Sequence, residues 1–565
     1  MELNADRAFK WGKFIALSIL IGLVTGVAVV LFLLLHNSIW FFTYRAIVEG
    51  AKPLIFIFPV TGIFVAFVLV RSLATTKTTG CGTHAVIESF HFYGGVIPFR
   101  DTSSKVVASA LTIGFGGSAG LEGPSILLGG GLASAIAQRA RLSPEELKAL
   151  MLAGAAAGLS AIFKAPLTGI LFALEIPYKR DLAKEAFIPA AIASVTSYLT
   201  LISLIGAETL FPIIPSLFVP SPIEIAHLIF IGLLASATSL FFIFTFRLME
   251  RFKVLIYNKF VLALLGGSLV GIMGLLLPYV MGAGYETISS AVQGKLHVLP
   301  IYVLVAILIF KILATSVTLN FGGSGGLFIP SIFIGAVLGS TYVAAFNPGF
   351  DEIAIMASMA AVLAAANKTL LTSVAFVAET CGPASIIPAL IASTVSFFTS
   401  GESSLYEPQL PRKVVEEGKA LCEMYRLMLK GKALERLKKI KIREVMTPNP
   451  VALNIKMSIE EALNVVKQHG FRIYPVVDDK KSLLGVVTLE DLLSVPPSKW
   501  TMPLDQTDIK PPLKALADQD LLSAITKMVE YCEDHVYVIS SEETNELIGV
   551  LAGIDVFKKI LESIR

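Results

Sequence analysis

Two stretches of the chain decide its architecture: GGSAGLEGPSILLGGGLAS (Gly116–Ser134) and GGSGGLFIPSIFIGAVLGS (Gly322–Ser340). They align without a gap at an offset of 206 residues and are identical at 11 of 19 positions. A weaker pair follows, PLTGILFALE ending at Glu175 and LLTSVAFVAE ending at Glu379, at an offset of 204 residues. The sequence therefore contains two structurally similar halves.

The composition around these repeats is that of a membrane protein. The 565 residues are 55% hydrophobic and 16% charged, whereas soluble domains carry roughly 25% charged residues. Five apolar runs are each about long enough to cross a hydrocarbon core of ~30 Å: Phe14–His36, Leu54–Val70, Ile225–Phe246, Phe260–Val280 and Leu299–Val317. The sequence predicts an all-α polytopic membrane domain with two repeats, for which we infer inverted topology because such pairs often have it.

Four further apolar segments are too short to span a membrane, and glycine or proline lies at or near their ends: Ser125–Ala137, Ala165–Leu174, Pro330–Val343 and Ile386–Phe398. Half-spanning helices are tolerated at membrane depth only where they are buried in protein or line an aqueous cavity. These segments therefore predict broken helices around a cavity.

The Gly-rich turn from Gly116 to Pro124 predicts what that cavity binds. Glycines allow the backbone to approach a ligand closely, and proline suits the first turn of a helix. The first N–H groups of such a helix lack partners and carry a partial positive charge, for which an anion is the natural partner. Because the turn from Gly322 to Pro330 repeats this design, we expect two helix N-termini to form one site for a small anion.

The two repeats differ in charge at one position, where the first repeat has Glu122 and the second has Phe328. An ionisable side chain at membrane depth is costly and indicates a function. A carboxylate beside helix N-termini would compete with the anion for the same N–H groups, and protonation would release it. We predict that Glu122 is gate and proton acceptor. The alternative is a buried glutamate that backbone donors satisfy and that has no gating role.

These motifs resemble those of the CLC family of chloride channels and proton/chloride antiporters. GLEGP (Gly120–Pro124) and GLFIP (Gly326–Pro330) match two family motifs, and KTTGCGTHAV matches a third around Cys81. A tyrosine near the end of the membrane part, Tyr406 in SGESSLY, matches a fourth element. The resemblance covers essentially all of residues 10 to 410.

The resemblance implies a role for each matching residue. Glu122 corresponds to the gating glutamate, and the N–H groups of Leu327 and Phe328 correspond to central anion donors. Tyr406 corresponds to the hydroxyl that closes the inner side, with an aromatic at the membrane interface as the alternative. The outer anion site is expected from the backbone around Gly120, Leu121 and Gly123. The family also implies a homodimer with one pathway in each subunit.

Four departures from the family motifs bear on mechanism. Leu121 replaces a basic residue, and Cys81 stands where serine or proline is usual, so a weak thiol donor leaves the anion preference open. Thr83 and His84 replace Ile-Pro, so the turn after Cys81 is expected to differ, and we assign His84 no role. Ile176 occupies the position of the inner proton-transfer glutamate of the exchangers. Isoleucine cannot relay a proton, so either the protein is a passive gated channel or water carries protons to Glu122.

Glu175 and Glu379 end the weaker repeat pair and are expected to have a structural role. We predict that they cap backbone or pair with basic residues, and we do not place them on a proton path.

The whole sequence divides into three parts. Residues 1–411 form the predicted transmembrane domain, residues 412–440 a charged helical connector, and residues 441–565 a cytoplasmic α/β module. Strand patterns such as YPVVD and LLGVVT alternate with amphipathic helices there. The module resembles a tandem CBS pair, with copies at about 441–497 and 498–565.

The CBS resemblance implies an adenine nucleotide as a ligand. In the first copy Thr488 and Asp491 fit the ribose-binding pattern, whereas in the second copy Asp555 remains but Ala552 replaces the hydroxyl residue. One adenosine site at Thr488 and Asp491 is expected. The alternative is that these two side chains merely cap the following helix, and that the module is a docking or dimer-contact element.

Several classes of function are disfavoured. A net charge of +3 gives no indication of a nucleic-acid partner. We expect no enzymatic activity, no required cofactor and no metal, because HExxH is absent and the cysteines lack paired spacing. A CBS-containing cation transporter, the remaining alternative, would need clusters of intramembrane carboxylates. The cysteines are Cys81, Cys381, Cys422 and Cys532.

The flanks of the first apolar run indicate location and orientation. We expect no cleavable signal peptide, and Lys10 and Lys13, which precede the run, predict a cytoplasmic N-terminus. We expect a multi-pass protein of a prokaryotic inner or plasma membrane, in contact with the lipid bilayer and with both termini cytoplasmic. The predicted cargo is chloride or a similar anion, with protons as the second candidate.

Overall fold

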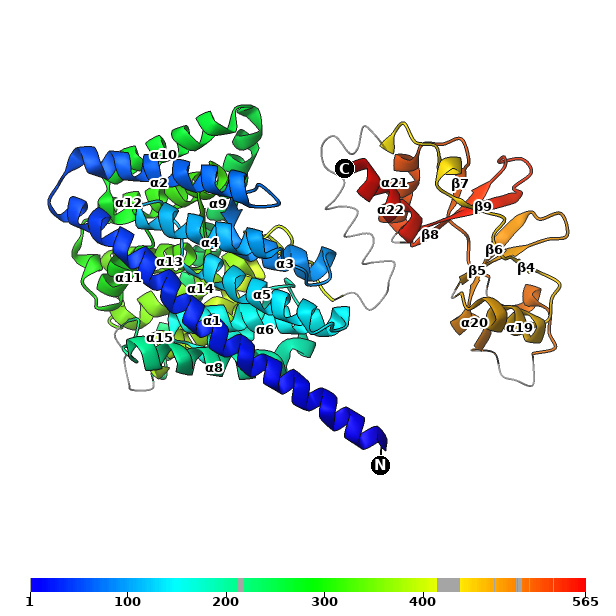
Figure 1. Ribbon diagram of the computed structural model, residues 1–565, viewed down its shortest axis with the longest axis horizontal. Coiled ribbons are helices and arrows are strands. Elements are labelled where there is room, and N and C mark those ends of the chain that lie inside the picture. Colours follow the sequence, from blue (N-terminus) through cyan, green and yellow to red (C-terminus); the bar gives the residue numbers. More distant parts are fainter. Residues whose placement is uncertain are drawn as a thin grey trace. The chain divides into compact units, whose positions relative to one another are not determined.

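The computed structural model describes residues 2–211, 218–413, 437–471, 473–493, 495, 500–507, 509–531 and 533–564. Contacts within the chain divide it into two units, Met1–Lys413 and Val414–Arg565, and each is described by itself (Figure 1). Residues 414–436 of the predicted connector, Cys422 among them, lie outside the described residues, as does Cys532.

The first unit is a bundle of helices that confirms the predicted polytopic membrane domain (Figure 1). Its described residues include eight helices that are long and apolar enough to cross a membrane. These are α1 (Glu2–Val48, apolar from Gly12), α2 (Lys52–Leu73), α6 (Pro144–Phe163), α8 (Phe187–Ile205), α9 (Pro222–Leu255), α10 (Lys259–Leu276), α12 (Ile301–Asn320) and α13 (Phe328–Phe346). The other helices are α3 (Gly82–Phe92), α4 (Phe99–Gly114), α5 (Glu122–Arg139), α7 (Pro166–Glu175), α11 (Tyr285–Val292), α14 (Asp351–Asn367), α15 (Leu370–Cys381) and α16 (Ile386–Thr399).

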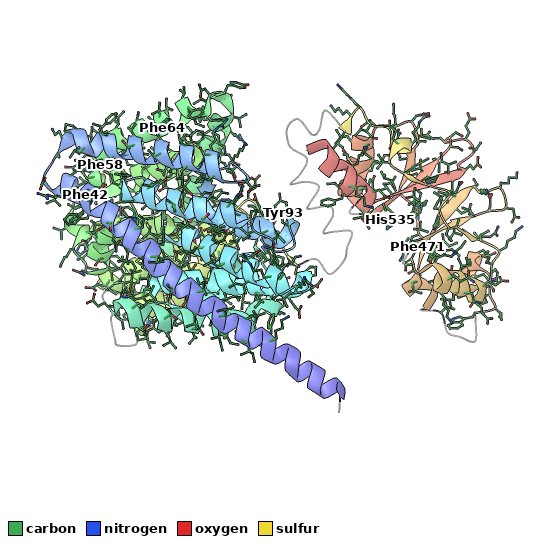
Figure 2. The ribbon with its side chains drawn as sticks, viewed as in Figure 1. Phe42, Phe58, Phe64, Tyr93, Phe471 and His535 are labelled. Atoms are coloured by element: carbon green, nitrogen blue, oxygen red, sulfur yellow. The ribbon has the colours of Figure 1, made fainter. Side chains whose placement is uncertain are left out.

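Large apolar side chains cover the outside of this bundle. Phe42, Phe58 and Phe64, on α1 and α2, lie at its periphery (Figure 2), and Phe42 and Leu31 are each 63% exposed. A soluble protein rarely exposes so many large apolar groups, whereas a lipid bilayer accommodates them. The interior is filled by alanine-rich and glycine-rich helices such as α6 and α14, which are almost wholly buried.

The prediction that Pro330–Val343 is too short to span is wrong. Helix α13 begins two residues before Pro330 and continues to Phe346, which gives it 19 residues. Proline in the first turn of a helix breaks no hydrogen bond, because the N–H that it lacks would have had no partner. Helix α5 likewise begins at Glu122, before Pro124. Helices α7, α15 and α16 are short, with 10, 12 and 14 residues.

Helices α7 and α15 are joined by a reciprocal pair of carboxylate caps. The Glu379 carboxylate accepts hydrogen bonds from the N–H groups of Leu167 (2.9 Å) and Thr168 (2.7 Å) and from the Thr168 hydroxyl (2.7 Å). Glu175 receives the same three bonds at the start of α15, from the Leu371 N–H (2.9 Å) and from the N–H (2.8 Å) and hydroxyl (2.6 Å) of Thr372.

These caps confirm the structural role predicted for the two glutamates. Each glutamate lies at or near the C-terminal end of one helix and caps the N-terminal end of the other. The two repeat-related helices therefore lie antiparallel, which is the relation that an inverted repeat requires.

The second unit consists of two similar α/β halves (Figure 1). One half contains the sheet β4-β5-β6 (Leu453–Asn454, Ile473–Val477, Leu483–Thr488) with α19 (Ile459–His469) and α20 (Leu489–Leu493). The other contains the sheet β3-β9-β8-β7 (Thr447–Pro448, Leu547–Ala552, His535–Ile539, Lys514–Leu516) with α21 (Leu521–Tyr531) and α22 (Gly553–Ile564).

The two halves share a detail of strand pairing. The register shifts at Val476/Val477 in the β5–β6 pair and at Val538/Ile539 in the β8–β9 pair. A buried cluster that includes Leu483 and Tyr537 contains residues of both halves. The two halves therefore repeat one arrangement of strands and helices.

We predict that Glu379→Leu destabilises the membrane unit by about 3 kcal/mol, because three donors at the start of α7 lose a charged acceptor. Glu379→Gln keeps one acceptor oxygen and should have a smaller effect. Thermal unfolding of the purified protein in detergent measures this. Glu402→Gln, at a half-exposed carboxylate, is the control. A Glu379→Leu variant as stable as the control variant would contradict the cap.

Candidate functional site

The candidate site forms where α5 and α13 begin. Two reciprocal backbone hydrogen bonds join the turns before them, from the Gly120 N–H to the Gly326 oxygen (3.0 Å) and from the Gly326 N–H to the Gly120 oxygen (2.8 Å). A second short pairing joins β1 (Gly80–Cys81) to β2 (Ser324–Gly325) in parallel. The three Gly-rich motifs of the sequence thus meet at one place.

The glycines at this junction are required by close contact between backbones. A Cβ atom at Gly123 would lie 2.6 Å from the Gly325 oxygen, and one at Gly82 would lie 2.4 Å from the Gly123 oxygen. Real Cβ atoms do not approach other atoms so closely. Side chains at these positions would separate the starts of the helices, so glycine is what allows the helix N-termini to converge.

The Glu122 carboxylate lies inside this junction and is completely buried. Its Oε1 accepts a hydrogen bond from the Phe328 N–H at 2.7 Å, and its Oε2 has no hydrogen-bond partner. The carboxylate fills the space that side chains at two glycines would need, since a Cβ at Gly120 would lie 1.9 Å from Oε2 and one at Gly326 would lie 2.1 Å from Oε1. An N–H group predicted to bind the anion therefore holds the predicted gate.

The predicted outer-site residues are placed by the same turn. Leu121 is almost fully buried and immediately precedes α5. The N–H of Gly120 is engaged with Gly326, whereas those of Glu122 and Gly123 belong to the first turn of α5, where a helix has no internal acceptor for them. Leu327 stands at the corresponding position before α13.

A second group of polar atoms lies around Tyr406. The Tyr406 ring and the Thr83 side chain are completely buried, and neither hydroxyl has a hydrogen-bond partner. The Cys81 sulfur faces the Thr83 side chain and the backbone N–H groups of Thr83 and His84. Tyr406 in turn interacts electrostatically with Cys81 and Glu122. Four side chains from three separate segments are therefore brought together: Cys81, Thr83, Glu122 and Tyr406.

The turn after Cys81 leads directly into a helix. Helix α3 begins at Gly82, so Thr83 and His84 both lie in its first turn. The His84 ring packs edge-on against the Tyr406 ring, with 5.4 Å between ring centroids. This contact positions the tyrosine.

Ile176 is completely buried and follows α7 directly. Its backbone oxygen accepts a hydrogen bond from the Gln409 amide at 3.0 Å, and the same amide donates to the Asn367 oxygen at 3.1 Å. These bonds tie the segment that follows Tyr406 to the ends of α7 and α14. No titratable side chain occupies the position of Ile176.

Sequence reasoning missed a buried cation, Lys311 in α12. Its ammonium donates to the backbone oxygens of Val280 (3.2 Å) and Gly282 (2.9 Å), lies 4.6 Å from the centre of the Phe333 ring, and is completely buried. It interacts electrostatically with Glu286 and with Glu122. A single lysine in the apolar run 299–317 was the signal that could have found it.

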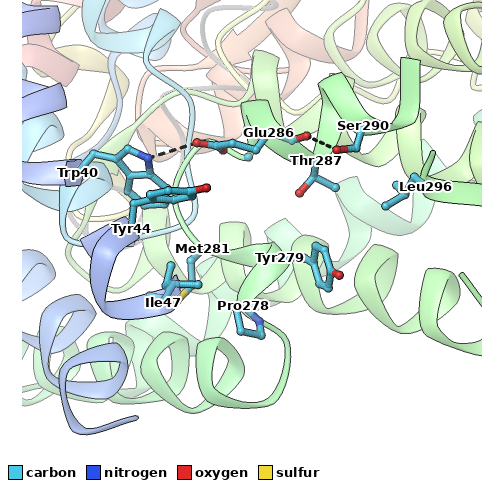
Figure 3. Close-up of a pocket in the computed structure, with 11 residues that line it drawn as sticks. Trp40, Tyr44, Ile47, Pro278, Tyr279, Met281, Glu286, Thr287, Ser290 and Leu296 are labelled. Carbon is cyan, nitrogen blue, oxygen red and sulfur yellow. Dashed lines mark hydrogen bonds between the residues drawn. The ribbon is translucent and has the colours of Figure 1, made fainter. Parts of the chain in front are cut away.

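Glu286 connects this cation to a pocket of about 370 Å³. The Trp40 indole donates to the Glu286 carboxylate at 3.4 Å, and both side chains line the pocket (Figure 3). The pocket is also lined by Tyr44, Ile47, Pro278, Tyr279, Met281, Gly284, Thr287, Ser290 and Leu296. Lys311 thus interacts with one carboxylate at a pocket and with a second, buried one.

The combined arrangement has the chemistry of a site for small anions. Helix N-termini offer backbone N–H groups, Thr83 and Tyr406 offer hydroxyls, and Lys311 contributes a buried amino group. The Glu122 carboxylate is the one anionic group among them and is attached to a side chain that can rotate. Among the described residues, no group of three or more His, Cys, Asp or Glu side chains could hold a metal ion.

Comparison with known families bears on this arrangement directly. A family model described as voltage gated chloride channel matches residues 61–401, which is more than half of the chain. The chain belongs to this family. A second model, described as CBS domain, matches residues 442–498.

Individual relatives agree with the family assignment. A protein of Citrobacter koseri named voltage-gated ClC-type chloride channel ClcB is 33% identical over 52% of this chain and 70% of its own length. The H(+)/Cl(-) exchange transporter ClcA of Klebsiella pneumoniae is 29% identical over 65% of this chain and 80% of its own length. The crystal structure of a CLC-type fluoride/proton antiporter has the same fold, with a TM-score of 0.63 and 24% identity over 72% of this chain and 99% of that chain.

The candidate nucleotide residues form a turn in the second unit. The Asp491 carboxylate accepts hydrogen bonds from the Thr488 hydroxyl (2.6 Å), the Thr488 N–H (3.0 Å) and the Lys510 ammonium (2.9 Å). The Thr488 hydroxyl in turn accepts from the Asp491 N–H at 3.1 Å. This is a reciprocal cap at the start of α20. Asp555 lies in the first turn of α22.

We predict that Gly326→Ala lowers chloride flux into liposomes. A methyl group there would lie 2.1 Å from Glu122 Oε1 and 2.6 Å from the Gly123 N, and overpacking of a buried site costs ~1–3 kcal/mol. Flux should fall about tenfold or more. Gly12→Ala, with nothing within 4 Å of the added atom, is the control. Unchanged flux in Gly326→Ala would show that the junction is not tightly packed.

We also predict that the Asp491 cap makes the second unit sensitive to acid. Burial opposes ionisation of Asp491, but hydrogen bonds from Thr488 and Lys510 outweigh it and hold the pKa below its usual value. The stabilisation, about 1 kcal/mol, is present above the ordinary aspartate pKa of roughly 4 and is lost as the pH falls through the lowered value.

Trp500 fluorescence reports this effect, because Trp500 packs in the same core as Leu492. The background carries Trp11→Phe and Trp40→Phe, which leaves one tryptophan. At neutral pH Asp491→Asn should lower the unfolding temperature of this unit, while Asp505→Asn, at an exposed side chain, should not. Equal unfolding temperatures in the parent and Asp491→Asn would refute the cap.

Proposed function

We propose that the chain carries chloride, or a similar small anion, across the membrane along a pathway that Glu122 gates. The observation that supports this most is the hydrogen bond of 2.7 Å from the Phe328 N–H to the Glu122 carboxylate. A carboxylate bound by a buried helix N-terminus is a tethered anion in a place suited to a mobile one. The proposal involves transport without a chemical change in the anion.

Gating follows from the competition between the two anions. While Glu122 is ionised, its carboxylate holds the Phe328 N–H and fills the space between Gly120 and Gly326. Protonation removes the charge that holds it there, so the side chain can leave and an anion can take its place. The hydroxyls of Thr83 and Tyr406, which have no partners, then offer the next donors along the path. Binding by partial charges also permits release.

Two modes of transport are compatible with this gate. A passive channel would conduct when Glu122 is protonated, whereas an antiporter would exchange protons held by Glu122 for the anion. The apolar side chain of Ile176, completely buried where the exchangers carry a glutamate, favours the passive channel. Proton exchange is the second candidate, and it would require water to carry protons to Glu122.

Orientation and regulation complete the proposal. We place both termini in the cytoplasm, because Lys10 and Lys13 precede the first span. The CBS module would then act from the cytoplasmic side. Adenine nucleotide binding at Thr488 and Asp491 would require the ribose to replace the bonds that Asp491 already makes with Thr488 and Lys510. The homodimer implied by the family resemblance belongs to the same proposal.

Reconstituted liposomes test the gate and the mode of transport together. Chloride efflux and proton movement are recorded in the same vesicles at several values from about pH 5 to about pH 9, a range that covers the titration of a buried glutamate. We predict that wild-type flux rises with acidity and that Glu122→Gln has a flux that no longer depends on pH. Glu352→Gln, at an exposed carboxylate of α14, should behave as wild type.

The proton signal decides between the two modes. Chloride flux without proton movement supports the passive channel, and uphill proton movement driven by chloride supports exchange. A pH dependence that persists in Glu122→Gln would refute Glu122 as the gate. A wild-type protein that carries no small anion would refute the proposed function.

A further inference from the structure

The pocket of about 370 Å³ beside Glu286 has no part in the transport pathway described above. Its wall is formed by the last turns of α1, by the short 3-10 helix Pro278–Val280 and by α11. Two helices that are long and apolar enough to cross a membrane end beside it, α1 at Val48 and α10 at Leu276. The pocket therefore lies at the level of the lipid headgroups.

Three aromatic side chains line this pocket: Trp40, Tyr44 and Tyr279 (Figure 3). The ring centroids of Trp40 and Tyr44 are 6.3 Å apart and the ring planes are tilted by 41°, so the two rings do not cover each other face to face. Tyr44 is 46% exposed and Tyr279 is 43% exposed. The face of an aromatic ring carries partial negative charge and attracts a cation. The pocket thus offers ring faces to a positively charged ligand.

Glu286 adds a carboxylate to the same wall. Its Oε1 accepts a hydrogen bond from the Trp40 indole N–H at 3.4 Å, and the side chain is exposed. The nearby basic groups are engaged elsewhere. Lys311 is completely buried and donates to two backbone oxygens, and Arg45 pairs with Glu49 at 2.6 Å. A belt of aromatic side chains at the membrane surface would explain the rings but not the carboxylate held against Trp40.

This combination of groups selects among the classes of ligand. A carboxylate disfavours an anion, and a hard metal ion needs several oxygen ligands, whereas the described residues contain no group of three or more His, Cys, Asp or Glu side chains that could hold one. An alkylated ammonium group spreads its charge over methyl groups, and aromatic ring faces recognise such groups. The pocket is large enough for one.

We propose that this pocket binds a quaternary ammonium group, with the rings of Trp40, Tyr44 and Tyr279 against its methyl groups and the Glu286 carboxylate beside its charge. The inference goes beyond the proposed function and does not depend on it. The same chemistry has two sources at this level of the membrane, the choline headgroup of a lipid and a free quaternary ammonium solute, and the experiment separates them.

Trp40 fluorescence tests the site on the full-length chain in a maltoside detergent, which carries no ammonium group. Trp11→Phe and Trp500→Phe leave Trp40 as the single tryptophan. Choline chloride replaces sodium chloride at a constant total concentration, so chloride and ionic strength stay fixed. We expect the emission to change and to saturate at roughly 1–10 mM choline. The rise of the unfolding temperature of the wild-type chain with choline repeats the titration without the tryptophan substitutions.

Matched variants assign the binding to the carboxylate and the rings. We expect Glu286→Gln and Tyr44→Leu each to weaken choline binding about tenfold. Tyr44→Phe keeps the ring face and should retain the parent affinity, as should Glu352→Gln at an exposed carboxylate outside the pocket. Equal emission in choline and in sodium, or parent affinity in both Glu286→Gln and Tyr44→Leu, would overturn the inference.

Nanodiscs of defined lipid identify the source of the ligand. If a lipid headgroup occupies the pocket, Trp40 emission in phosphatidylcholine discs should equal that of choline-saturated protein in phosphatidylglycerol discs, and added choline should change nothing further. If a free solute occupies it, added choline should change the emission in both kinds of disc. Emission that is the same in both lipids and does not respond to choline in either would overturn the inference, whatever the protein transports.

Discussion

The contact on which the rest of the membrane unit depends is the meeting of two peptide backbones at Gly120 and Gly326. Their reciprocal hydrogen bonds, 3.0 and 2.8 Å long, bring the first turns of α5 and α13 against a single buried carboxylate. Glycine at 82, 123 and 326 is required because an added Cβ atom would lie 2.4 to 2.6 Å from a backbone atom of the neighbouring turn. The reciprocal caps of Glu175 and Glu379 fix a second repeat-related pair of helices, so both pairs obey one symmetry.

Charge at this junction is distributed in a way that suits transport. The positive ends of helices and hydroxyl donors carry partial charges, and a site built from them can release an anion as well as bind it. The buried lysine Lys311 is set back in α12, where it donates to two backbone oxygens and lies against the Phe333 ring. Leu121 replaces the basic residue of the family motif and carries no charge. Lys311, in contrast, is a buried lysine that interacts electrostatically with Glu122.

Much of this arrangement could be predicted from the sequence because short local sequence patterns determine it. The repeat places Glu122 beside a helix start, and Gly-Pro spacing marks where the helices begin. The length of α13 was misjudged because proline was taken as the start of the helix, whereas the first turn accommodates it. The contact between the His84 and Tyr406 rings and the burial of Lys311 could not be derived in this way. Their meaning depends on which side chains face them from segments distant in the sequence, and periodicity carries no such information.

Anomalous diffraction from crystals grown in bromide can locate an anion at the converging helix N-termini and show whether Glu122 blocks its site. We expect a bromide peak beside the Tyr406 hydroxyl in the wild-type protein. We expect a second peak, next to the Phe328 N–H, in Glu122→Gln after the side chain has left. Crystals in which bromide occupies neither position, in either protein, would contradict the account.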